Sequence, residues 1–164
     1  MPKWYARSNP SAIPSTPWLS PQAVRYFEGI LQPDFRVIEH GSGGSTLWFA
    51  ERVKEVIAYE VDLDWFAMLN ERKPDNVKLR NANKPSKYKQ LFDLLLIDGE
   101  PVRDRVTWLE CAPQIVKPGG WVVLDNANRP EYAVARAEFG EFGKLVYTVD
   151  ANEDGTQYLV TEFY

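Results

Sequence analysis

Apolar and polar positions along the chain follow two different periods. Short β-branched or aromatic runs bounded by polar, Pro or Gly residues predict strands, and stretches with apolar residues three or four apart predict helices. The expected strands span residues 35–40, 55–61, 76–81, 91–98 and 119–126, with two later ones at 144–149 and 156–164. The expected helices span residues 21–32, 45–53, 63–73, 102–116 and 130–142.

The order of these elements predicts the fold class. Strands that alternate with helices indicate an α/β domain with a parallel sheet, and a nearly continuous apolar strand at 91–98 is typical of a sheet with helices on both faces. The last two strands are joined by "DANEDG", in which Asp154 and Gly155 supply the chemistry of a tight turn. We therefore expect a mostly parallel, seven-stranded sheet that ends in an antiparallel hairpin.

The N-terminal residues depart from this pattern. Four prolines among residues 1–19 predict an extended arm, whereas Ser20 followed by Pro21 is typical of a helix start. The aromatic side chains of the arm could form a lid over a pocket or pack on the edge of the sheet, and packing is the default expectation. The length of 164 residues and the hydrophobic content of 45% predict a single domain over 20–164.

Charge and cysteine content restrict the setting in which the protein acts. A net charge of −4 disfavours a surface for duplex nucleic acid, and the three lysines of "NKPSKYKQ" are best interpreted as a solvated loop. The single cysteine, Cys111, rules out an internal disulfide and fits a reducing compartment. The sequence contains neither a signal-peptide pattern nor an apolar run of membrane-spanning length. We expect a cytoplasmic protein without nucleic-acid or membrane partners.

The stretch "FRVIEHGSGGSTLWFAERVKEVIAYEVD", residues 35–62, contains the strongest functional signal. In open parallel sheets, ligands bind outside the carboxyl ends of the strands, where this glycine turn is expected to lie. Gly41 and Gly43 would allow a sharp turn and a close approach of a ligand to the backbone. Glu60 ends the second strand, nineteen residues after Gly41, where a carboxylate can accept hydrogen bonds from both hydroxyls of an adenosine ribose.

The nature of the ligand follows from what this stretch lacks. The dinucleotide fingerprint requires glycine where Thr46 stands, and a phosphate-binding loop requires a lysine, which does not occur between Phe35 and Val53. Glu39, two residues before the first glycine, is placed to attract an ammonium group directly or through water. S-adenosylmethionine combines an adenosine, a sulfonium and an amino-acid ammonium, and fits these features.

Several motifs together carry a family resemblance. The segments "VIEHGSGGSTLWFAERVKEVIAYEVDLDWF", "FDLLLIDG", "VKPGGWVVLDN" and "NRPEY" resemble the class I, Rossmann-like S-adenosylmethionine-dependent methyltransferases. The resemblance is nearest to a small bacterial and phage-type branch with "GSGGST" after the first strand. It extends from about Phe35 to Tyr132. It implies a methyltransferase of the EC 2.1.1 class with S-adenosylmethionine as cofactor.

The resemblance also implies a set of cofactor-binding residues. Glu39, Gly41, Ser42 and Gly43 would line the methionine part, Glu60 would hold the ribose, Val61 would touch the adenine, Asn81 or Asn83 would lie near the adenine edge, and Asp98 would also contact the cofactor. Paired asparagines after a strand are equally well explained as ordinary turn residues.

Three polar residues follow the fourth and fifth strands and are candidates for catalysis. Asp98, Asp125 and Asn126 are expected at the same sheet edge as the cofactor. They could bind Mg²⁺ or another divalent metal, which would lower the pKa of an acceptor hydroxyl, and in this they are similar to metal-dependent catechol and caffeoyl-type O-methyltransferases. Alternatively, Asp98 touches the cofactor or a loop amide and the Asp125–Asn126 pair caps the next helix. His40 is interpreted as a structural residue in preference to a catalytic base.

Three classes of function remain open from the residues. The first is methyl transfer to a small hydroxylated acceptor such as a sugar or a natural-product intermediate, where a second subunit, for example in a homo-oligomer, could complete the pocket. The second is an accessory or sensor domain that binds S-adenosylmethionine without catalysis. The third is another enzyme that uses the same cofactor on the same fold, such as an aminopropyl transferase or a lyase.

Overall fold

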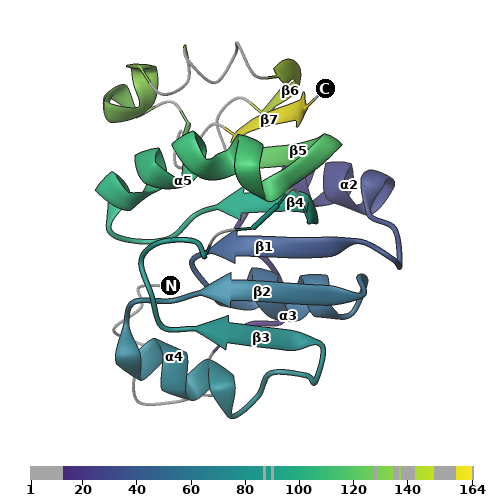
Figure 1. Cartoon of the computed structure of the whole chain (residues 1–164). Helices are drawn as coiled ribbons and strands as arrows, with labels where there is room; N and C mark the ends of the chain where they lie inside the picture. The colour runs from purple at the N-terminus through teal and green to yellow at the C-terminus, as the bar shows by residue number, and fades with distance from the viewer. Residues whose placement is uncertain are drawn as a thin grey trace.

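The computed structural model describes residues 13–86, 88–89, 91–127, 129–134, 137, 143–149 and 158–163. Its core is a seven-stranded sheet of order β3-β2-β1-β4-β5-β7-β6 (Figure 1). The strands are β1 (Arg36–His40), β2 (Glu55–Tyr59), β3 (Val77–Arg80), β4 (Phe92–Ile97), β5 (Val116–Leu124), β6 (Gly143–Val149) and β7 (Tyr158–Phe163). Neighbours among β1 to β5 pair in parallel, whereas β7 pairs antiparallel with both β5 and β6.

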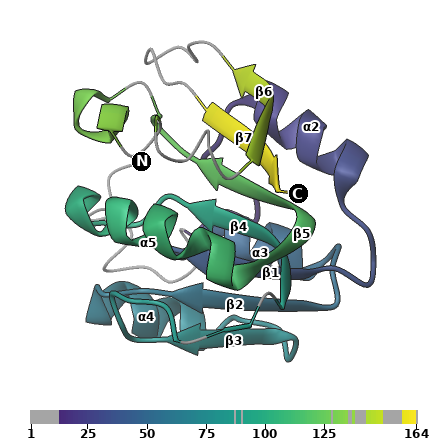
Figure 2. The ribbon, with the colours of Figure 1, turned by 45° about the horizontal axis from the view of Figure 1, so that its top comes forward.

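Helices cover both faces of this sheet (Figure 2). They are α2 (Pro21–Ile30), α3 (Gly44–Ala50), α4 (Leu63–Asn70) and α5 (Val102–Ile115), followed by the 3-10 turn η2 (Pro130–Tyr132). Buried side chains of α2, α3 and α4 form one apolar core with alternate residues of β1, β2, β3 and β4. Side chains of α5 form a second core with the other residues of the central strands. The period of two along each strand thus divides the apolar residues between two helical layers.

The observed elements confirm the α/β class and the parallel sheet. The antiparallel pairing of the last two strands is observed, but the turn expected at Asp154 and Gly155 lies outside the described residues. Most of the helix expected over 130–142 also lies outside them. The helix expected over 45–53 was wrong at both ends, because α3 begins at Gly44 and ends at Ala50.

The start of α2 shows that local capping was correctly predicted. The Ser20 hydroxyl accepts a hydrogen bond from the Ala23 amide at 3.1 Å, and Pro21 occupies the first helical position. No helix in the described part of the chain is long and apolar enough to cross a membrane.

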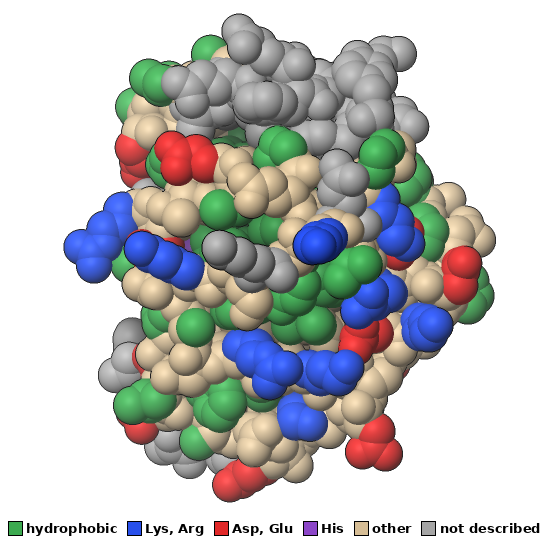
Figure 3. All heavy atoms as spheres, viewed as in Figure 1, with side chains coloured by type: hydrophobic (Ala, Val, Ile, Leu, Met, Phe, Trp, Pro, Cys, Tyr) green, Lys and Arg blue, Asp and Glu red, His purple; other side chains and the backbone are tan. Residues whose placement is uncertain are grey.

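The face of β1, β2 and β3 that lies on the side of α5 carries charged residues toward its outer strand. Arg36 and Lys78 both form ion pairs with Glu55, and Lys78 and Arg80 alternate with buried apolar residues on β3. Figure 3 shows Lys and Arg side chains spread over the viewed face of the molecule. In the basic loop that follows β3, Lys84 and Lys89 are exposed, whereas Lys87 lies outside the described residues.

The direction of the chain reverses between β1 and β4, which are parallel neighbours in the centre of the sheet. The chain continues from β1 toward β2 on one side, and from β4 toward β5 on the other. Such a reversal opens a crevice at the carboxyl ends of the strands. Here the backbones of Gly41 and Gly99 are so close that a Cβ on Gly41 would lie 2.8 Å from the Gly99 Cα. Gly41 also has a φ of +96°, which side chains rarely tolerate.

We predict opposite effects for alanine at two glycines. Gly41→Ala should lower the free energy of unfolding by more than about 1 kcal/mol, because it combines positive φ with a backbone clash. Gly29→Ala, on the exposed side of α2 with no described atom within 4 Å of its Cβ, should raise it by about 0.5–1 kcal/mol. Urea denaturation of both variants tests this. Equal destabilisation of the two variants would contradict the proposed contact between Gly41 and Gly99.

Candidate functional site

The buried carboxyl group of Glu39 lies at the end of β1, beneath the glycine turn. Its Oε2 accepts a 2.6 Å hydrogen bond from the Thr46 hydroxyl, whose oxygen in turn accepts the Gly43 amide at 3.0 Å. The other oxygen, Oε1, is buried and has no hydrogen-bond partner among the described residues. Burial raises the pKa of Glu39 to about 8, with a smaller contribution from the Asp98 charge, although the hydrogen bond from Thr46 and the nearby Ser45 hydroxyl oppose the shift. The group is therefore largely protonated at neutral pH, and none of the described residues places a cation beside it.

The Trp65 side chain of α4 holds the glycine turn. The Trp65 indole donates a 2.7 Å hydrogen bond to the Ser42 carbonyl and lies 3.5 Å from the position of a Cβ on Gly43. The backbone of Gly43 is extended at φ 163°, so neither its conformation nor its surroundings demand glycine. The neighbouring Gly44 does require glycine, because a Cβ there would lie 2.1 Å from the carbonyl oxygen of Thr16.

Glu60 directly follows β2 and is brought against the turn, as the spacing predicted. Its Oε2 accepts from the amide and the hydroxyl of Ser42 at 3.3 and 3.2 Å. Its Oε1 accepts from the amides of Val61 and Asp62 at 3.0 and 2.9 Å. The two contacts to Ser42 are long, so a ligand hydroxyl could replace them at small cost while the other two fix the carboxylate.

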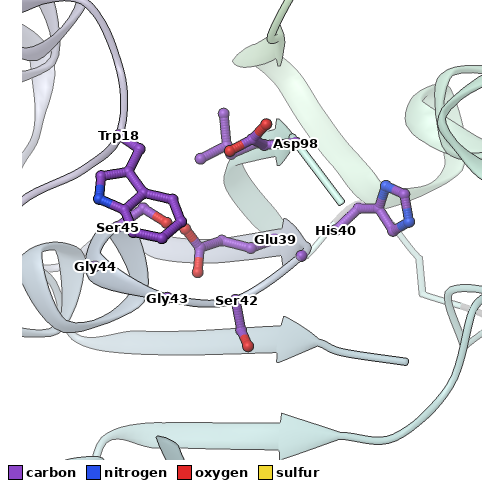
Figure 4. A pocket seen from close by; sticks show the side chains of 10 residues that line it. Trp18, Glu39, His40, Ser42, Gly43, Gly44, Ser45 and Asp98 are labelled. Atoms are coloured by element: carbon purple, nitrogen blue, oxygen red, sulfur yellow. The ribbon is translucent and has the colours of Figure 1, made fainter. Parts of the chain in front are cut away.

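A hollow that is partly open to solvent lies over this turn. It is lined by Trp18, Glu39, His40, Gly41, Ser42, Gly43, Gly44, Ser45, Leu96 and Asp98. Figure 4 shows Glu39 reaching toward Ser45 and Trp18, with Asp98 on the opposite side and His40 directed away. Candidate residues of the methionine subsite thus surround one pocket.

The residues expected near the adenine lie next to Glu60. Val61 is exposed, and the Asn81 amide donates a 2.8 Å hydrogen bond to the Glu60 carbonyl. Asn83 lies farther along the loop, where its carbonyl accepts from the Trp108 indole at 3.2 Å. Of the two asparagines considered, Asn81 is therefore the one that contacts the end of β2.

The polar residues after β4 and β5 are brought together by a buried arginine that was missed in the sequence. Arg105 of α5 donates to the carbonyls of Gly99, Asp98 and Asp125 at 2.8–2.9 Å. It also donates to Asp98 Oδ1 at 3.3 Å and to Asn126 Oδ1 at 3.1 Å. Asn126 has a left-handed backbone with φ 56°, an uncommon conformation that asparagine tolerates. The Arg105 guanidinium thus joins the Asp98 and Asn126 side chains to the backbone of both loops, whereas Asp125 Oδ1 is buried and has no hydrogen-bond partner among the described residues.

The cluster does not have the arrangement expected of a metal site. Among the described residues, no three His, Cys, Asp or Glu side chains are grouped so that they could hold a metal ion. Two of the three predicted ligands, Asp98 and Asn126, direct side-chain oxygens to Arg105. Burial, followed by the charge of Asp98, raises the pKa of Asp125 well above its usual range, which favours a neutral acid. The hypothesis of a divalent metal on these residues is therefore not supported.

His40 is buried and stacks on Trp108 with ring centroids 5.1 Å apart. This position on the α5 side of the sheet agrees with the structural role expected from strand alternation. Local patterns could not identify Arg105 or Gly44 as site residues, because each acts through a contact with a distant segment. For Arg105 the only sequence signal was an arginine within a helix of mixed polarity. Trp18 belongs to the aromatic residues of the arm for which a lid over a pocket was one of two expectations, and it lines the hollow.

Comparison with solved structures identifies the fold. The N-methyltransferase NodS from Bradyrhizobium japonicum WM9, in complex with S-adenosyl-L-homocysteine, superposes with a TM-score of 0.67 at 13% identity over 87% of this chain and 84% of that one. An rRNA methylase from Streptococcus thermophilus gives 0.69 at 11% identity, over 90% and 99%. The tRNA (m1A58) methyltransferase TrmI from Aquifex aeolicus gives 0.68 at 17% identity, over 92% and 72%.

The chain has the fold of S-adenosylmethionine-dependent methyltransferases. At these identities the similarity is one of fold, and the three neighbours differ in what their names say they methylate. No protein-family model matches the chain, and no curated protein matches it in sequence.

We predict that the protein without ligand loses stability as pH rises. The folded-state pKa of Glu39 is about 8 against an ordinary value of 4.5, so the folded state holds the extra proton between these values. The contribution of this proton is complete below pH 4.5 and is lost as pH rises through 8. Glu39→Gln should flatten this slope and be more stable than wild type at pH 8.5 by ~1–3 kcal/mol. Chemical denaturation at several pH values measures it.

The exposed Glu71→Gln is the matched control and should leave the slope unchanged. A slope that persists in full in Glu39→Gln would show that Glu39 does not hold the proton.

Proposed function

We propose that this protein is an S-adenosylmethionine-dependent methyltransferase that transfers the methyl group to the oxygen of a small hydroxylated acceptor. The observation that carries the proposal is the buried, unpartnered Glu39 oxygen beside the glycine turn, with Glu60 on the other side of that turn. A buried carboxyl oxygen without a partner is costly, and an ammonium group is the ligand that relieves the cost.

The cofactor fits the residues around the pocket. The ammonium would pair with Glu39, and Gly41, Ser42 and Gly43 would line the methionine chain. Glu60 would accept from the ribose hydroxyls when the long contacts from Ser42 are replaced. Val61 and Asn81 lie where the adenine would follow. When bound, the cofactor supplies an electrophilic methyl group on a sulfonium.

The protein's own contribution to transfer is mainly positioning, because displacement at the methyl carbon needs the acceptor oxygen in line with the breaking carbon–sulfur bond. Asp98 lines the pocket and its side chain is 34% exposed, so it can meet an acceptor. We assign it the role of accepting the hydroxyl proton as the oxygen–carbon bond forms. Arg105 fixes Asp98, Asp125 and Asn126 in place, so that Asp125 and Asn126 are positioning residues.

A small acceptor is favoured over a nucleic acid by two features. The net charge of −4 gives little electrostatic attraction for a polyanion. The acceptor side of the pocket carries the carboxylates of Asp98 and Glu100, both beside the buried Arg105. A phosphate backbone would meet like charge there, whereas a neutral hydroxylated molecule would find hydrogen-bond acceptors.

We predict that the wild-type protein binds S-adenosylmethionine and that Glu60→Gln weakens this binding at least about tenfold. The substitution keeps the size of the side chain but removes a charged acceptor of the ribose hydroxyls. Titration calorimetry measures both affinities, with NAD as a ligand that should not bind. Glu28→Gln, at an exposed position of α2, is the matched control and should behave as wild type. Binding of NAD in place of S-adenosylmethionine would contradict the cofactor assignment.

We predict that Asp98→Asn lowers methyl transfer at least ~100-fold, because it removes the group that accepts the proton. The measurement is release of S-adenosylhomocysteine with a panel of small hydroxylated acceptors. Asp75→Asn, at an exposed position before β3, is the control. A wild type that binds the cofactor yet turns over no acceptor of any class would favour an accessory or sensor domain. An Asp98→Asn variant with full turnover would remove Asp98 from the mechanism.

A further inference from the structure

The N-terminal segment formed by residues 13–18 is built into the domain next to the glycine turn. Ile13 is 1% exposed and belongs to the core formed with α2, α3 and α4. Its carbonyl accepts a 2.8 Å hydrogen bond from Arg72, which follows α4. The carbonyl of Thr16 lies against Gly44, where a Cβ would meet it at 2.1 Å. The second glycine of "GG" is therefore needed for this segment to pass over the start of α3.

This path places Trp18 at the mouth of the pocket. Its ring lies 5.9 Å from that of Trp65, which itself holds the Ser42 carbonyl. Trp18 lines the same hollow as Glu39 and Ser45, and Figure 4 shows the indole beside both. Its side chain remains 43% exposed, so part of the indole surface is not covered by the protein.

We infer that Trp18 is a wall of the cofactor site and that its free surface packs against the amino-acid end of S-adenosylmethionine. The inference rests on the proposed function and goes further, because it assigns a ligand contact to a segment outside the sheet and helices. The unpartnered Glu39 oxygen fixes where the ammonium goes, and Trp18 lies beside that carboxyl group. An indole attracts a cation through the face of its ring, and its apolar surface suits the methylene chain.

The alternative is that Trp18 only packs on Trp65 and seals the edge of the domain. The two roles differ in which part of the ligand they affect. A wall at the amino-acid end contributes to binding of S-adenosylmethionine and S-adenosylhomocysteine, which both carry the amino acid. It contributes nothing to binding of 5′-methylthioadenosine, which has the nucleoside and the sulfur but no amino acid.

The test compares these three ligands by titration calorimetry on the full chain. Trp18→Ala should weaken S-adenosylmethionine and S-adenosylhomocysteine about tenfold and leave 5′-methylthioadenosine within about twofold. Trp18→Phe should recover most of the lost affinity, because it restores an aromatic face. Leu91→Ala is the matched control, since Leu91 is 41% exposed and lies just before β4, away from the pocket.

Each outcome decides between the roles. A Trp18→Ala variant that loses affinity for all three ligands equally, or for none, overturns the inference. If Trp18→Ala does not fold, Trp18→Leu keeps the apolar bulk and should still weaken the two amino-acid ligands selectively. A wild type that binds none of the three ligands overturns the proposed function itself, which is a separate result.

Discussion

The fold of the site depends on one buried carboxyl group placed where β1 ends. The Glu39 carboxyl group accepts a hydrogen bond from the Thr46 hydroxyl, and the Thr46 oxygen accepts one from the Gly43 amide. A single chain of hydrogen bonds therefore joins β1, the turn and α3. This arrangement uses only one carboxyl oxygen. The other oxygen is buried and has no hydrogen-bond partner among the described residues. This burial raises the pKa of the Glu39 carboxyl group, because ionisation without a partner is unfavourable. The turn thus keeps a carboxyl oxygen buried without a partner, and a cationic ligand would remove the free-energy cost of that burial.

The same physical logic explains why the two acidic positions with raised pKa values have different roles. Glu39 has no cation among the described residues close to its orphan oxygen, so a ligand can supply one. Asp125 lies near Arg105, but that guanidinium is shared among three carbonyls, Asp98 and Asn126. Its charge lowers the pKa of Asp125 less than burial and Asp98 raise it. Under the proposed function, the first group binds and the second stays neutral and positions.

Much of this architecture could be predicted from the sequence, since strand and helix periods fix the layers and carboxyl ends of neighbouring parallel strands must meet. That rule placed Glu60 beside the turn and Asp98 near Asp125. It could not say which glycine is needed, because a Cβ on Gly43 would only make an ordinary van der Waals contact with Trp65, whereas Gly44 faces the backbone of a segment almost thirty residues earlier. The rule could not find Arg105 either, because a buried arginine within a helix is recognised only from its contacts in the folded structure.

Arg105 also explains why the residues that resemble those of metal-dependent enzymes are not grouped as a metal site in the described part of the chain. An Asp after β4 and an Asp–Asn pair after β5 can be organised by any cation that fits their oxygens. Here the cation belongs to the chain and donates hydrogen bonds in a planar fork, which suits carbonyl and carboxylate oxygens from two loops at once. The guanidinium holds the Asp98 and Asn126 side chains and the backbone carbonyls of both loops, while Asp125 Oδ1 is buried without a hydrogen-bond partner among the described residues. Under the proposed function, the acceptor would be activated by a carboxylate at the edge of the cluster, and Asp98 is the member that both contacts Arg105 and lines the pocket.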